Sequence, residues 1–195
     1  MTSRYQKLEI ALRYYLKGAR YHTALKALDF ASKWHRGFRK DGVTPEMQHQ
    51  VEMALYVITL KGIKDEEKSI VAVLLHDVLE DYPNSEVKFM DVFNNDTYLL
   101  CQKLNKNGKN LVDYFDAISK DPVASIVKGA DRVHNVNSMV GVFSKEKQKK
   151  YIQEVNEYFL PMLKKARKNF PEQLDAYFNI MHMLRSQVAL LEGQL

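Results

Sequence analysis

The stretch Val71-Ala72-Val73-Leu74-Leu75-His76-Asp77-Val78-Leu79-Glu80-Asp81 places two opposing demands on the fold. Its valines and leucines predict a helix buried in a core, whereas its imidazole and three carboxylates lose hydration there unless something pairs with them. A divalent cation is a common partner for such a mixture of donors. We therefore interpret the stretch as half of a metal site whose other half lies elsewhere in the chain.

The rest of the chain has the pattern of an all-α protein. Its 195 residues include only 8 glycines and 5 prolines, and apolar residues recur mostly at steps of three and four. This length suits one domain. We expect a single helical bundle of about eight to ten helices over residues 1–195. Its motif core covers about 20–142, and C-terminal helices over 144–192 pack on that core.

Start and stop residues divide the periodic pattern into individual helices. The quoted stretch falls at the end of a helix expected over residues 65–81, and Asp121-Pro122 marks the start of another. The other expected helices cover residues 1–18, 20–35, 46–60, 85–93, 96–104, 111–119, 144–169 and 171–192.

The composition indicates in which cellular compartment the protein resides and which kinds of partner it binds. A single cysteine, Cys101, rules out an intramolecular disulfide and a cysteine-rich zinc site. The sequence has neither a signal-peptide pattern nor an apolar run of roughly 20 residues that would span a bilayer, so we expect a cytoplasmic protein without membrane contact. The net charge of +5 suits a polyanionic small molecule as well as nucleic acid. The basic runs are most simply solvated helix faces, so nucleic acid is not the expected partner, and a homo-oligomer stays open.

A second polar group follows Asp121-Pro122. Asp131 and Asn135 are four residues apart and therefore share one face of a helix, with His134 beside them. We expect His134 to support a ligand from behind, because Asp131 and Asn135 already occupy the inward face.

Together, the histidines and carboxylates suit a hard-to-borderline metal such as Mn²⁺ or Fe²⁺. The ligands that we expect from three helices are His49, His76, Asp77 and Asp131. Such an ion acidifies a bound water and neutralises phosphate charge, so hydrolysis of a phosphate ester or anhydride is the expected reaction. Glu80 and Asp81, one turn beyond the His-Asp pair, are placed to orient the water or to carry its proton.

These residues also carry a family resemblance. His49, the segment Leu74-Leu75-His76-Asp77-Val78-Leu79-Glu80-Asp81 and the segment Lys128-Gly129-Ala130-Asp131-Arg132-Val133-His134-Asn135 resemble the HD-domain hydrolases of the RelA/SpoT type. Those enzymes remove the 3′-pyrophosphate from the alarmones ppGpp and pppGpp. The resemblance covers about residues 24–142, in the family's order and spacing. It implies a stand-alone small alarmone hydrolase of the HD superfamily, with no synthetase domain after Leu195.

The resemblance implies a role for each matching residue. The catalytic Mn²⁺, or another divalent metal in its place, would be held by His49, His76, Asp77 and Asp131. The attacking water would be handled by Glu80 and Asp81. The purine nucleotide polyphosphate, a guanosine or adenosine compound, would be contacted by Arg39, Lys40 and Asn135. Arg132 and His134 would stand behind the ligands and fix their geometry.

The chain also departs from the family's pattern. Pro45-Glu46-Met47-Gln48-His49-Gln50 stands where the family usually has Pro-Tyr-Ile-x-His-Pro, and Tyr82 and Asn137 replace a common Thr and a common Arg. Two alternatives therefore stay open. One is an HD-type phosphohydrolase that acts on a deoxynucleotide or a cyclic dinucleotide. The other is a non-catalytic nucleotide binder, against which the presence of every expected ligand argues.

Overall fold

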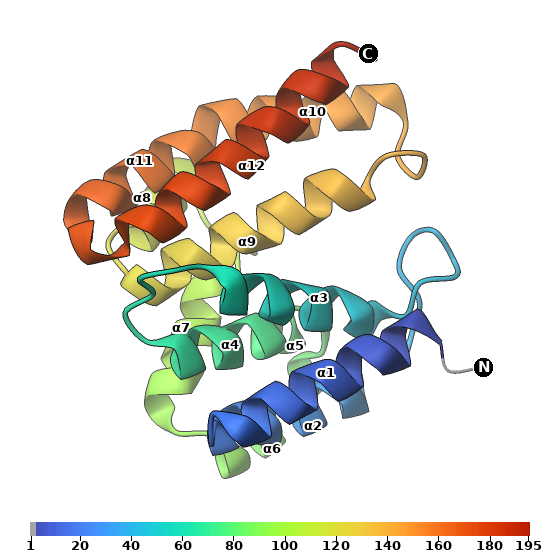
Figure 1. Cartoon of the computed structure of the whole chain (residues 1–195), viewed down its shortest axis with the longest axis vertical. Helices are drawn as coiled ribbons and strands as arrows, with labels where there is room; N and C mark the ends of the chain where they lie inside the picture. The colour runs from blue at the N-terminus through green and yellow to red at the C-terminus, as the bar shows by residue number, and fades with distance from the viewer. Residues whose placement is uncertain (1–2) are drawn as a thin grey trace. The chain divides into compact units, whose positions relative to one another are not determined.

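The computed structural model describes residues 3–195, and these form α-helices joined by short loops (Figure 1). The predicted all-α class is confirmed. Within residues 3–195 there is no β-strand, only an isolated bridge between Phe38 and Pro45. In the same range, no helix is both long enough and apolar enough to cross a membrane.

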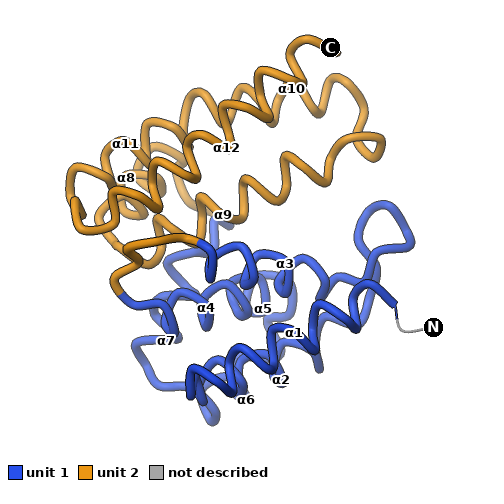
Figure 2. The backbone as a smooth tube through the Cα atoms, in the orientation of Figure 1, with its two compact units in different colours: residues 1–59, 65–107 blue, residues 60–64, 108–195 orange. Residues whose placement is uncertain are grey.

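The chain divides into two compact units (Figure 2). The first unit comprises residues 1–59 and 65–107, and the second comprises residues 60–64 and 108–195. The single domain expected over residues 1–195 stays a prediction.

The first unit holds the quoted stretch. Its helices are α1 (Arg4–Gly18), α2 (His22–Trp34), α3 (Glu46–Thr59), α4 (Glu66–Leu75), α5 (Val78–Asp81), α6 (Glu86–Val92) and α7 (Asn95–Leu104). Helix α4 is buried on every side from Ser69 to Leu75 and packs against α2, α3 and α7. A helix that is apolar all round belongs in a core, and this accounts for the central position of α4.

The helix expected over residues 65–81 is interrupted. Asp65 caps it as its sequence predicts, accepting the backbone N–H of Lys68 at 3.0 Å, but α4 ends at Leu75 and α5 begins at Val78. The Nδ1 atom of His76 lies 2.8 Å from the carbonyl oxygen of Val73. In a continuous helix that carbonyl would accept the backbone N–H of residue 77. The imidazole competes for this acceptor, which accounts for the break.

The second unit is built around α9. Its helices are α8 (Leu111–Ser119), α9 (Pro122–Ser138), α10 (Lys145–Glu154), α11 (Leu160–Asn169) and α12 (Leu174–Glu192). Asp121 caps α9 as predicted, accepting the backbone N–H groups of Val123 and Ala124, both at 3.0 Å. Helices α8, α11 and α12 pack on α9.

Glycine is required where α9 meets its neighbours. A Cβ atom added at Gly129 would lie 2.9 Å from Ile180 Cγ2 and 3.0 Å from Leu163 Cδ2, so the helices approach more closely than any side chain allows. Further on, the helix expected over residues 144–169 is divided by a π-helical turn at Val155–Phe159. Pro161 comes two residues after this turn, at the second position of α11; it lacks a backbone N–H and crowds the preceding turn, which accounts for the wider turn there.

Candidate metal centre

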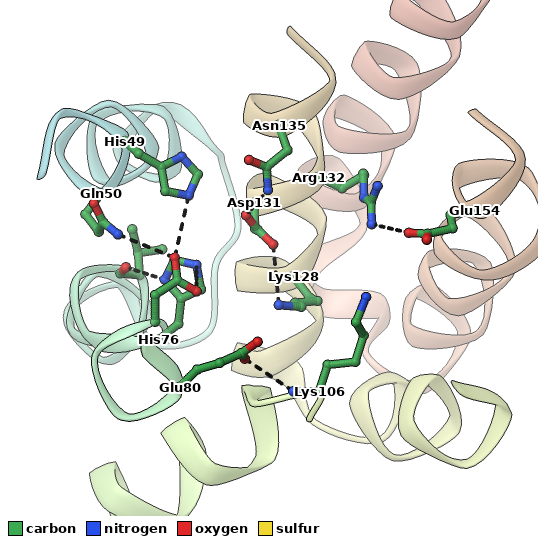
Figure 3. Close-up of polar contacts among 12 residues, drawn as sticks. His49, Gln50, His76, Glu80, Lys106, Lys128, Asp131, Arg132, Asn135 and Glu154 are labelled. Carbon is green, nitrogen blue, oxygen red and sulfur yellow. Dashed lines mark hydrogen bonds and ion pairs between the residues drawn. The ribbon is translucent and has the colours of Figure 1, made fainter. Parts of the chain in front are cut away.

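Three side chains of the first unit bring potential metal donors together. One donor atom from each of His49, His76 and Asp77 lies within 4.8 Å of the others (Figure 3). The Asp77 carboxylate is 3.1 Å from His76 Nε2 and 4.0 Å from His49 Nε2. His49 and His76 are 2% and 1% exposed, and Asp77 is reachable from solvent through its 28% exposed side chain. The two imidazoles are therefore buried, and the Asp77 side chain connects the group of donors to solvent.

The helices that carry these donors determine how they are oriented. His49 sits on the buried face of α3, whereas His76 and Asp77 occupy the break between α4 and α5. In the tautomer with the proton on Nδ1, His76 donates a hydrogen bond to the Val73 carbonyl. Its Nε2 atom then has a free lone pair, which points towards Asp77. A backbone carbonyl that holds one ring nitrogen is the usual way in which a ligand histidine is oriented.

The donor set fits a divalent metal. With metal–ligand bonds of about 2.0–2.2 Å, two ligands of one ion lie roughly 3–4.4 Å apart. His76 Nε2 lies 3.1 Å from Asp77 Oδ1 and His49 Nε2 lies 4.0 Å from Asp77 Oδ2, so each imidazole is at this separation from one carboxylate oxygen. Two imidazoles and one carboxylate suit Mn²⁺, Fe²⁺ or Zn²⁺ rather than Mg²⁺ or Ca²⁺, which prefer oxygen ligands throughout.

Gln50 is a neighbour that the sequence did not single out. Its Nε2 lies 3.5 Å from Asp77 Oδ2, and the side chain is 2% exposed. Its Oε1 is buried and has no hydrogen-bond partner among residues 3–195. A signal was available, because Gln50 is a polar residue directly after His49 on a face rich in buried side chains.

The two expected water-handling residues lie just beyond the donors. Glu80 accepts the backbone N–H of Lys106 at 3.4 Å, which ties α5 to the loop after α7. Asp81 lies at the surface, yet the packed chain beneath it and the charges of Asp77 and Glu80 raise its pKa to about 6. An aspartate with such a pKa is a stronger base than usual near neutral pH.

Arg39 and Lys40 occupy the loop that leads into α3. The loop is closed by the Phe38–Pro45 bridge and by the Asp41 carboxylate, which accepts the N–H groups of Val43 and Thr44. The Thr44 hydroxyl also donates to this carboxylate, and that hydrogen bond, followed by the two backbone ones, lowers the pKa of Asp41 to about 2. Contact of Arg39 and Lys40 with a nucleotide stays a prediction.

Two of the residues at which the chain departs from the family's pattern contact each other. The hydroxyl of Tyr82 donates to Glu46 Oε2 at 2.9 Å, and that hydrogen bond contributes to raising the pKa of Tyr82 to about 12, after burial. The same Glu46 oxygen accepts the backbone N–H of Gly37 at 3.3 Å. Glu46 therefore joins the start of α3 to the residue that follows Asp81.

A second polar group lies on α9, in the second unit. Asp131 Oδ1 accepts the side-chain amide of Asn135 at 2.5 Å, and Asp131 Oδ2 lies 3.4 Å from Lys128 Nζ (Figure 3). The side chains of Lys128 and Asp131 are only 10% and 11% exposed. Sequence reasoning missed Lys128, although its spacing of three residues from Asp131 on a helix was a usable signal. Participation of Asp131 and Asn135 in a metal or nucleotide site stays a prediction.

Arg132 and His134 also lie on α9. Arg132 Nη2 is 2.7 Å from Glu154 Oε2, and the guanidinium lies over the rings of Tyr151 and Phe159 at 4.6 Å and 4.1 Å from their centroids. These contacts fix α10 and the π-helical turn against α9. His134 is half-buried on the same helix. The expected support of metal ligands by Arg132 and His134 stays a prediction.

Comparison with known proteins agrees with this geometry. Residues 27–110, which contain all three clustered donors, match the family model described as HD domain. The "Probable guanosine-3′,5′-bis(diphosphate) 3′-pyrophosphohydrolase" of Synechocystis sp. is 30% identical over 149 residues, covering 70% of this chain and 19% of that protein. The guanosine-3′,5′-bis(diphosphate) 3′-pyrophosphohydrolase of Aquifex aeolicus is 30% identical over 146 residues, covering 70% of this chain and 20% of that protein.

A relative with a different name matches almost as well. The GTP pyrophosphokinase of Myxococcus xanthus is 28% identical over 152 residues, covering 70% of this chain and 20% of that protein. The chain thus spans about a fifth of the length of these curated relatives. Residues 27–110 thus match the HD-domain model, and about 70% of the chain is similar to part of two proteins named as guanosine-3′,5′-bis(diphosphate) 3′-pyrophosphohydrolases.

Proposed function

We propose that this chain is a metal-dependent hydrolase that removes the 3′-pyrophosphate from guanosine tetra- or pentaphosphate, or from the adenosine analogue. The observation that carries the proposal is the buried group of His49, His76 and Asp77 donors inside an HD domain. The names of the two 3′-pyrophosphohydrolase relatives support the choice of substrate.

Four residues would hold the metal. His49, His76 and Asp77 would bind through two imidazole nitrogens and a carboxylate, and Asp131 would add a second carboxylate. We propose Mn²⁺, because it accepts mixed nitrogen and oxygen ligands. When bound, such an ion lowers the pKa of a coordinated water and neutralises charge on the phosphate.

Glu80 and Asp81 would manage the proton of the attacking water. The proton would pass to a carboxylate oxygen of Asp81, whose raised pKa of about 6 favours its uptake. In the balanced reaction the water oxygen bonds to the phosphorus next to the ribose, and the bond from that phosphorus to the 3′ oxygen breaks. A proton is placed on the departing 3′ oxygen, and inorganic pyrophosphate is released.

Basic and amide groups would position the nucleotide. Arg39 and Lys40 would hold the purine end, and Asn135 would contact the ribose or a phosphate. Contacts at the purine and at the ribose or phosphate would hold the 3′ phosphorus near the attacking water. Such positioning of the reactants lowers the entropic part of the activation barrier.

The test is a hydrolysis assay on the purified chain with Mn²⁺, which measures pyrophosphate released from ppGpp and from its adenine analogue. We expect release that stops when a chelator removes the metal and that is lost in His76→Ala. His22→Ala is the matched control, because His22 is an exposed histidine in the same unit. Absence of pyrophosphate release from both nucleotides, with folded and metal-loaded protein, contradicts the proposal.

The Tyr82–Glu46 hydrogen bond favours a second candidate. It joins two positions at which the chain departs from the family's pattern, at the first residue of α3 and just after α5. The candidate is an HD-type phosphohydrolase that acts on a deoxynucleotide or a cyclic dinucleotide. In a nucleotide panel, preference for a compound without a 3′-pyrophosphate supports it. Binding without turnover that is unchanged in His76→Ala would instead indicate a non-catalytic binder.

Cytoplasmic location and assembly into a homo-oligomer are further proposals. Phe178 and Met183 on α12 are 49% and 37% exposed, and they offer an apolar surface for a second copy. Sedimentation velocity of the purified chain gives its oligomeric state directly.

A further inference from the structure

A cavity lies in the first unit, between the carboxyl end of α2 and helix α6. Its volume is about 560 Å³, within the range of about 300–1,000 Å³ usual for small-molecule sites. The residues that give it chemical character are Phe30, Lys33, Trp34, Arg36, Lys88 and Asp91. None of these is a donor in the His49, His76 and Asp77 group.

The charge of the cavity favours an anion. Lys33, Arg36 and Lys88 are all exposed at its rim, and Asp91 is the one acidic residue in the lining. Within residues 3–195, none of the three cationic side chains forms an ion pair with a carboxylate. Three cations that surround one concave surface are complementary to a phosphate group.

The floor of the cavity favours a flat aromatic group. Trp34 is half-buried there, and its ring packs against Tyr82 and Phe30, with 5.9 Å and 6.3 Å between the centroids. The Lys88 ammonium lies 5.7 Å from the centroid of the Trp34 ring. Stacking of a nucleobase on an aromatic side chain is favourable and tolerates any base, because every base has a π-face.

A purely structural role accounts for only part of this arrangement. Lys33 lies in the last turn of α2, where a cation compensates the helix dipole and stabilises the helix. Lys88, in contrast, lies in the first turn of α6, where the dipole disfavours a cation. The cation–π contact with Trp34 offsets part of this cost and holds the ammonium at the cavity, where it can also reach a bound anion.

We propose that this cavity binds a nucleoside monophosphate or diphosphate, with the base stacked on Trp34 and the phosphates contacted by Lys33, Arg36 and Lys88. This site is additional to the proposed hydrolase site and does not depend on it. The base would take the position over the indole ring, and Lys88 would turn to the phosphate.

Trp34 provides the measurement, because it is the only tryptophan in the chain. Titration with AMP or GMP is expected to quench its fluorescence and to saturate. Adenosine tests the ring alone, and inorganic phosphate tests the charge alone. We expect each of these two probes to bind at least about tenfold more weakly than AMP, since each lacks one set of contacts.

Substitutions of single residues test whether AMP binds in this cavity. Lys88→Glu is expected to weaken AMP binding by about tenfold or more, because it removes a charge-assisted contact and adds repulsion. Lys17→Glu makes the same charge change on the exposed surface of α1 and should bind AMP like the unchanged chain. Asp77→Ala should also bind AMP normally, which separates this cavity from the proposed metal site. Thermal unfolding followed by circular dichroism checks that each variant is folded.

Three results would overturn the proposal. They are the absence of a saturable change up to millimolar AMP, equal affinity in Lys88→Glu and the unchanged chain, and loss of the quenching in Asp77→Ala. The last would assign the signal to the hydrolase site. Pyrophosphate release from ppGpp is measured separately, so failure of one proposal leaves the other intact.

Discussion

Helix α4 in the first unit and helix α9 in the second are both buried along most of their length, yet they carry polar side chains in different ways. Along α4, every residue from Ile70 to Leu75 is apolar, and the polar pair His76-Asp77 comes where the helix is broken. Helix α9 is continuous from Pro122 to Ser138, and its polar groups pair with one another along one face.

The difference indicates two ways to keep polar groups in a core. On α9, an ammonium and an amide satisfy the Asp131 carboxylate at spacings of three and four residues, so the group is stable as a local network. At the end of α4, the break turns His76 and Asp77 towards His49 on another helix. Donors from two helices that are brought together in this way suit a bound metal cation. Variants at the end of α4 and variants on α9 can each test this comparison.

The largest effect is expected where the donors gather. Asp77→Asn keeps the shape of the side chain but removes the charge, so bound Mn²⁺ should be lost and hydrolysis should fall about 1,000-fold, equivalent to roughly 4 kcal/mol. Metal content by mass spectrometry and pyrophosphate release measure the two effects. Asp96→Asn, at the exposed start of α7, is the control. A variant that retains both its metal and its activity would remove Asp77 from the site.

The next effect concerns α9. Lys128→Met leaves the buried Asp131 carboxylate without its ammonium, and the free energy of unfolding should fall by about 2–3 kcal/mol. The double variant Lys128→Met/Asp131→Asn should recover most of that loss, because no charge is then left buried. Urea unfolding of the set measures this coupling. Equal loss in the single and double variants would show that packing, rather than the ion pair, stabilises this part of α9.

A smaller effect is expected at Gln50, beside the break. Gln50→Leu removes the amide near Asp77, so Mn²⁺ affinity should fall by about tenfold. This is the lower end of the loss of metal affinity that is usual when a residue that orients a ligand is changed. Stability should not fall, because the change also removes a buried oxygen that has no partner within residues 3–195. Calorimetric titration and thermal melting report the two quantities. Gln48→Leu on the same helix is the control, and a parallel loss of stability and affinity would indicate a packing role instead.

The smallest effect concerns the pH dependence of stability. In the absence of metal, Asp81 has a pKa of about 6 when folded and about 3.8 when unfolded, so the folded chain binds the proton more tightly. Its contribution to stability is present below pH 3.8 and is lost as the pH rises through 6. Asp81→Asn should therefore raise Tm above pH 6, while abolishing the proton transfer proposed for Asp81.

Solvent limits the size of this shift. Because Asp81 lies at the surface, screening reduces the effect to about 1 kcal/mol or less, or about 2–4 °C in Tm. Melting curves of the metal-free proteins between pH 4 and about pH 8 test it. A Tm difference that stays constant across this range would contradict the raised pKa.

Much of the fold was accessible from the sequence because its signals are local. Asp65 and Asp121 cap their helices where their side chains predict, and the apolar run Val71 to Leu75 is buried as its composition requires. The break at His76 was not accessible, because hydrophobic periodicity does not record a side chain that competes for a backbone carbonyl. The π-helical turn before Pro161 was missed for a related reason, since a proline permits several local solutions.

The residues of the candidate site also divide into those that the sequence predicts and those that it does not. His49, His76 and Asp77 were selected by residue type and spacing, and the structure gathers them. Gln50 and the Tyr82–Glu46 hydrogen bond were missed, since they depend on which side chains meet across α3 and α5. Such contacts between elements have no fixed spacing in sequence.

The contact between His76 and the Val73 carbonyl also bears on how tightly an ion could bind. The interruption of the helix is associated with the chain's own imidazole, so the donors are gathered during folding and before an ion arrives. The conformational entropy of that arrangement is lost before binding, which favours affinity through preorganisation. A chain with leucine at position 76 would lack both a donor and the competitor for the Val73 carbonyl, so the change would remove a ligand and its preorganisation together.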